Sequence, residues 1–150
     1  MQGRLSVVTL TLMSMLATTS STRAHHADSI YDKERLVTVT GDVVRFEFVN
    51  PHNVIYLDVR DGDGTSRRWI VYGAAPVALA RVGWNQKIIQ LGEQLTITGF
   101  QRKDGSRNML HLRITRASGE PLPLGEAEQN YLRKFEQSGN ELGHTSQQSR

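Results

Sequence analysis

Histidines carry most of the chemistry available to this chain, because it contains five of them and no cysteine. His25 and His26 stand together directly after an apolar opening segment. If the chain is cut after Ala24, His25 becomes the first residue and gains a free α-amino group beside its imidazole. The α-amino nitrogen and Nδ1 of one such histidine can hold a metal ion, and a second histidine can complete a T-shaped set of three nitrogens. Among the divalent first-row metals, copper(II) has the highest affinity for nitrogen ligands.

Three further histidines are candidate partners for a copper(II) ion held by His25. They are His26, His52, which follows a proline break, and His111, which we expect on the outer face of the last strand. The sequence therefore predicts copper as the cofactor, with His25, His26, His52 and His111 as candidate ligands. The alternative is a solvated N-terminus without metal, in which Asn50 and His52 hydrogen-bond the loop backbone around the strand break.

The opening segment has the three parts of a secretory signal peptide. Arg4 supplies the positive start, Leu5–Leu16 is a mostly apolar run, and Thr22 and Ala24 are small residues at the positions that a signal peptidase recognises. The apolar run is far shorter than the ~20 residues that span a bilayer. We therefore predict a signal peptide over residues 1–24, a periplasmic or secreted location, and no membrane span once the signal is removed.

Removal of the signal changes the charge of the chain. The full sequence has 18 basic and 15 acidic residues, and the first 24 residues contain Arg4 and Arg23 but no acid. The mature chain would therefore have 16 basic and 15 acidic residues, a net charge of +1. So small a charge gives no strong field for attracting phosphate backbones, and we expect no nucleic-acid partner.

Apolar alternation predicts five strands, with one short helix between strands three and four. The strands are expected from Leu36 to the break at Asn50, over 54–60, 67–73, 95–102 and 109–115, and the helix over 76–82. Apolar residues change parity at Gly41-Asp42-Val43, which indicates a bulge or bend in the first strand. This order is typical of a mainly β, five-stranded OB-type barrel, and a β-sandwich is the alternative. We place a lead-in over residues 25–35, the barrel over 36–124, and a polar, largely disordered tail over 125–150 with a short helix around 127–137.

The chain resembles an uncharacterised family of small exported bacterial proteins, a domain of unknown function. The resemblance covers roughly residues 24–118 and rests on four stretches of sequence. These are Ala24-His25-His26, FVNPHNVIYLDVRD (48–61), ARVGW (80–84) and LGEQLTITGFQRKDGS (91–106). It implies export and a compact β-barrel, and it supplies no catalytic residue.

An aromatic face is the second candidate site. OB barrels often bind oligonucleotides or sugars over strands two and three, where Tyr56, Trp69 and Tyr72 could form a stacking platform. The sequence has no Gly-x-Ser-x-Gly motif and no other recognisable nucleophile motif. We therefore expect an exported, non-enzymatic binding or accessory protein whose partner is a small ligand or a protein. It would bind copper(II) through His25 or, without metal, a sugar, peptide or other small ligand on the aromatic face.

Overall fold

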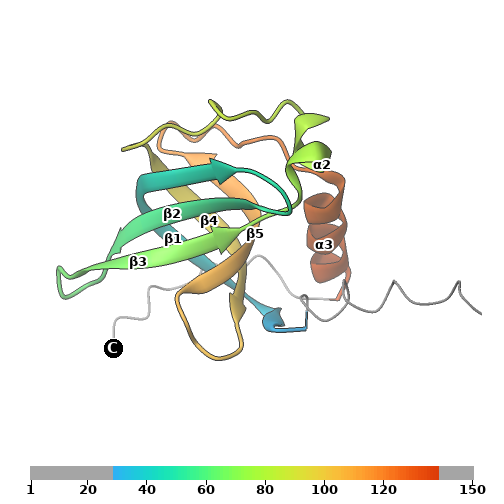
Figure 1. The fold of residues 1–150 in the computed structure, drawn as a ribbon. Coiled ribbons are helices and arrows are strands. Elements are labelled where there is room, and N and C mark those ends of the chain that lie inside the picture. Colours follow the sequence, from blue (N-terminus) through green and yellow to red (C-terminus); the bar gives the residue numbers. More distant parts are fainter. Residues whose placement is uncertain (1–28, 139–150) are drawn as a thin grey trace, which may run out of the picture.

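The computed structural model describes residues 29–138, which form five strands and two helices (Figure 1). The strands are β1 (Tyr31–Phe48), β2 (Asn53–Arg60), β3 (Ser66–Tyr72), β4 (Gln94–Arg102) and β5 (Asn108–Arg116). The helices are α2 (Pro76–Ala80), between β3 and β4, and α3 (Glu126–Gln137), after β5. Within this part of the chain, no helix is both long enough and apolar enough to cross a membrane.

The five strands close into a barrel in the order β1-β2-β3-β5-β4. The β3–β5 pair is parallel and joins residues 70–72 to residues 108–110, whereas the other four pairs are antiparallel. A closed five-stranded barrel with a helix between the third and fourth strands is an OB-type fold. The predicted fold class is therefore confirmed, and closure of the sheet excludes the alternative sandwich.

The long first strand takes part in both halves of the barrel by changing partner near its middle. Residues 31–42 pair with β4, and residues 41–48 pair with β2, so Gly41 faces Val59 on one side and Leu95 on the other. The register shifts between Val43 and Arg45. The predicted bend is thus present, and its bulge lies immediately after the Gly41-Asp42-Val43 segment.

The sheet begins at Tyr31 rather than at Leu36, so part of the expected lead-in belongs to β1. Tyr31 pairs with Arg102, and the register then shifts before Leu36 pairs with Phe100. The Tyr31 side chain is buried beside Phe100 in a small apolar cluster. The polar residues between Tyr31 and Leu36 do not alternate with apolar ones. For this reason the sequence did not predict a strand over this stretch.

Two apolar clusters stabilise the fold. The main one fills the barrel and includes Leu57, Trp69 and Trp84, while the smaller one contains Leu132 and Phe135 of α3. Figure 1 shows α3 beside the barrel, next to β5. The segment before α3 is fixed to the barrel because the indole nitrogen of Trp84 donates to the Pro123 carbonyl at 2.8 Å. Helix α3 therefore covers part of the outside of the barrel, where a site can form between the two.

Candidate functional site

A cavity of about 420 Å³ lies where the beginning of β1, the end of β3, the first half of β5 and α3 meet. Its walls are mainly apolar and aromatic, with Tyr31, Tyr72, Leu110, Leu112 and Tyr131 among the lining residues. An apolar, concave space with a few polar groups is the usual form of a small-molecule site. The chemistry of this cavity therefore depends on the polar side chains that reach it.

His111 is the most deeply buried polar group of the cavity. Its side chain is 2% exposed, and its ring stacks on the Trp84 indole with centroids 5.9 Å apart and planes within 1° of parallel. Neither ring nitrogen has a hydrogen-bond partner among the described residues 29–138. Burial lowers the pKa of this imidazole to about 4, so the ring is neutral near pH 7. A neutral imidazole offers one N–H donor and one nitrogen acceptor.

Gly73 allows the His111 ring to lie close to the end of β3. A Cβ at position 73 would collide with the His111 ring and with the side-chain amide of Asn53. That amide donates to the Ala74 carbonyl at 2.9 Å, and the Gly73 N–H donates to the Asn53 carbonyl at 3.1 Å. The chain after the Asn50–Pro51 break, whose peptide is cis, is therefore bound firmly to the segment that borders the cavity.

His52 lies on the same cavity but is exposed to solvent. Its Nδ1–H donates to the Gly73 carbonyl at 3.2 Å, which leaves the lone pair on Nε2. A histidine that ligates a metal through one nitrogen usually donates the other N–H to a backbone carbonyl or carboxylate. His52 thus makes the backbone contact expected of a loop histidine. The same contact leaves Nε2 as the nitrogen through which His52 could bind a metal.

One cationic and one anionic side chain line the cavity and keep a buried atom unpaired. Nε of Arg102 and Oε2 of Glu128 have no hydrogen-bond partner in the part of the chain that the structure describes, although other atoms of these side chains do. The Arg102 guanidinium pairs with Asp104 at 3.1 Å, and Oε1 of Glu128 accepts from the Ala74 N–H at 3.3 Å. The cavity therefore holds both signs of charge and has no strong preference for either.

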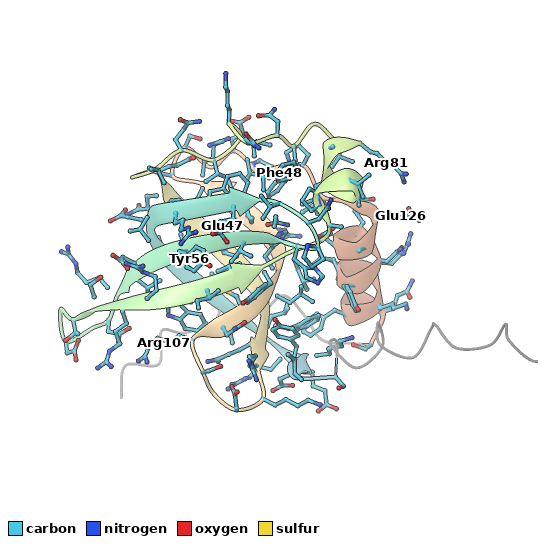
Figure 2. All side chains as sticks on the ribbon, viewed as in Figure 1. Glu47, Phe48, Tyr56, Arg81, Arg107 and Glu126 are labelled. Carbon is cyan, nitrogen blue, oxygen red and sulfur yellow. The ribbon has the colours of Figure 1, made fainter. Side chains whose placement is uncertain are left out.

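The structure keeps Tyr56 and Tyr72 on the outward side of neighbouring strands but places Trp69, the third aromatic residue expected on that face, in the core. Trp69 is 8% exposed and lies in the main core, because its neighbours on the outward side of β3 are Ile70 and Tyr72. Tyr56 is on the outside, where its hydroxyl donates to Oε2 of Glu47 at 3.3 Å (Figure 2). Burial and the Glu47 carboxylate raise the pKa of the Tyr56 hydroxyl. A stacking platform that includes Trp69 is therefore not formed.

The four candidate metal ligands fall into two groups. His52 and His111 line one cavity, whereas His25 and His26 lie outside the described residues. The expectation that His111 is on an outer, exposed face is wrong, because the register of β5 shifts against β4 beside Gly99 and the ring turns onto Trp84. Residues 29–138 contain no cluster of three or more histidine, aspartate or glutamate side chains that could hold a metal on their own.

Sequence reasoning missed Arg102, Glu128 and Tyr131 as residues of this site. Arg102 is the last residue of β4, whereas Glu128 and Tyr131 both lie on α3, and each is a polar residue of a type common on surfaces. The one available signal was Glu128, which is buried although it lies in the first turn of a helix rich in charged residues. Its position three residues after the N-cap Gly125 is typical of a helix-capping glutamate.

Comparison with protein families gives a match over residues 12–111, two thirds of the chain, to a family of unknown function named DUF6152. The chain belongs to DUF6152. The matched range includes His25, His52 and His111 and ends before α3. The resemblance to an uncharacterised family is thereby confirmed at the level of the family. No curated protein matches this DUF6152 chain in sequence.

Solved structures similar to the DUF6152 chain include the mitochondrial single-stranded DNA-binding protein Rim1 of S. cerevisiae. That match has 9% identity and a TM-score of 0.43, and it covers 61% of this chain and 96% of Rim1. A structure of yeast Stn1 and Ten1 matches with 13% identity and a TM-score of 0.36, covering 71% of this chain and 53% of the other.

Proposed function

We propose that this DUF6152 chain is an exported, non-enzymatic binding protein that holds one copper(II) ion at the mouth of the cavity. His25 would supply its α-amino nitrogen and Nδ1, and His52 would supply Nε2. The observation that carries the proposal is the hydrogen bond from His52 Nδ1 to the Gly73 carbonyl, which leaves Nε2 with a lone pair at a solvent-exposed position.

The position at which the N-terminal segment reaches the barrel supports the choice of His25 and His52 as ligands of the same ion. Ile30 and Tyr31 line the cavity that His52 also lines. Ile30 lies five positions after His25, and five residue steps span at most roughly 17 Å when extended. An N-terminal histidine is therefore within reach of His52 without any rearrangement of the barrel. His111 is the less suitable third ligand, because its ring is buried on Trp84.

The proposal predicts that the exported chain beginning at His25 binds one equivalent of copper(II) as a nitrogen-rich type 2 centre. Measurement of the intact mass first establishes which residue begins the exported chain. Copper titration followed by electron paramagnetic resonance then measures the stoichiometry and the type of the copper centre. His52→Ala should weaken binding by at least about tenfold, since it removes one of three nitrogens held in a fixed geometry. Acetylation of the N-terminus should weaken it similarly.

His111→Phe is the matched control, because it replaces the buried ring and leaves the mouth of the cavity intact. Its copper affinity should equal that of the wild type. A loss of copper affinity would instead indicate that His111, and not His52, supplies the third nitrogen. Cleavage at another bond than Ala24–His25, or unchanged affinity after acetylation, would overturn the proposal.

A further inference from the structure

The interior of the cavity has room for a ligand of its own, apart from the mouth where His52 lies. Its volume of about 420 Å³ is well above the ~150 Å³ of an apolar cavity that accepts benzene. Aromatic rings of Tyr31 and Tyr72 and the aliphatic side chains of Leu110 and Leu112 line it. A ligand with an apolar body about the size of two fused rings fits such walls.

The His111 side chain determines which polar group a ligand of this site must carry. A buried imidazole whose two nitrogens have no partner among residues 29–138 is costly, because within this part of the chain nothing replaces its hydrogen bonds to bulk water. One nitrogen needs an acceptor and the other needs a donor. A hydroxyl group is the smallest organic group that can serve in either role. A carbonyl or an ether oxygen serves only the N–H.

The charges around the cavity select against an ionic ligand. Arg102 and Glu128 both line it, and each keeps one buried atom that has no partner among residues 29–138. A cation attracted to the carboxylate would also lie near the guanidinium, and an anion attracted to the guanidinium would also lie near the carboxylate, so each ion is repelled by one of the two charges. A neutral ligand avoids both penalties.

From these observations we propose that the cavity binds one small, neutral, largely apolar molecule that carries a hydroxyl group, and that the His111 imidazole recognises this hydroxyl. The ligand contacts the walls formed by β1, β3, β5 and α3. The site uses none of the three nitrogens assigned to copper, so it stands or falls independently of the proposed function.

The test compares 2-naphthol with naphthalene, which has the same ring system and no hydroxyl, by isothermal titration calorimetry on the mature chain at pH 7. Wild type should bind 2-naphthol about tenfold more tightly, because one buried hydrogen bond contributes about 1.4 kcal/mol. Nuclear magnetic resonance of the His111 ring nitrogens should report a hydrogen bond with 2-naphthol only. His111→Phe should bind both compounds with equal affinity.

Ala127→Phe is a second variant, on an exposed position of α3 that lines the cavity. It keeps His111 and should weaken both probes alike, so it tests the location even if His111→Phe does not fold. Equal affinity of the wild type for the two probes would overturn the proposal, as would a preference that survives in His111→Phe. Binding of neither probe, or binding unaffected by Ala127→Phe, would overturn it too. An acetylated chain that loses copper and still prefers 2-naphthol would separate the two sites.

Discussion

Acidification from pH 7 to pH 4 is expected to lower the free energy of unfolding of this chain by about 3 kcal/mol through His111 alone. Burial lowers the pKa of the folded His111 ring from 6.5 to about 4. Between these values the unfolded chain binds a proton that the folded chain does not, so the free energy of unfolding rises with pH across this window. The full contribution is present above about pH 6.5. It is lost as the pH falls toward 4, and urea unfolding in steps of pH measures the loss.

His111→Phe is the control, because phenylalanine can keep the stack on Trp84 and does not titrate. Its free energy of unfolding should change much less between pH 6.5 and pH 4 than that of the wild type. The carboxylates of Asp58 and Asp104 are not expected to produce the same effect. Hydrogen bonds from Arg68 and Ser106 lower their pKa values, so they become protonated at lower pH. An equal pH dependence in wild type and variant would contradict the assignment to His111.

The sequence predicted the barrel correctly because most of its strands have one face in the core and one in solvent. In β2, Ile55, Leu57 and Val59 are buried and alternate with less buried residues. Alternation of this kind identifies a strand and the side of it that faces the core. The turn before β3 contains Gly64, whose φ of 82° is a conformation that favours glycine.

The same reasoning failed for His111 because both faces of β5 are covered. Leu112 is buried against the α3 cluster, whereas His111 is buried against Trp84. The register shift beside Gly99 also changes which residues point inward along the strand. An irregular strand buried on both sides has no alternation from which the direction of one side chain can be inferred.

The cavity could not be predicted from the sequence, because its walls come from segments that are far apart in the chain. Tyr31 and Tyr131 are one hundred residues apart, yet both line it. Neither belongs to a local motif, and only the docking of α3 on the barrel brings them together. By contrast, the Asn50-Pro51 break located His52 correctly, since the backbone hydrogen bonds of an interrupted strand must be satisfied nearby.

The two histidines of the cavity differ in ways that suit different roles. His52 is exposed and has one nitrogen fixed by a backbone carbonyl, which prepares the other for a metal. His111 is buried, and neither of its ring nitrogens has a hydrogen-bond partner among residues 29–138.

Replacement of Gly41 by valine is expected to lower the free energy of unfolding by about 3 kcal/mol. A Cβ at this position would lie 2.6 Å from the backbone oxygen of Asp58 and 2.9 Å from the Val59 side chain. The backbone of β2 cannot give way easily, because Gly41 pairs with Val59 and Leu95 at once, where β1 passes from one half of the barrel to the other. Urea denaturation at pH 7 measures the change.

Asp42→Val is the matched control on the next residue of β1, which is exposed. Valine favours strands, and on propensity alone both substitutions would stabilise by up to about 1 kcal/mol. A neutral or stabilising effect at Asp42 together with a large loss at Gly41 would therefore assign the loss to crowding against β2. Equal effects at the two positions would contradict that account. Because the cavity needs the beginning of β1 to stay on β4, Gly41→Val should also weaken 2-naphthol binding, although Gly41 does not line the cavity.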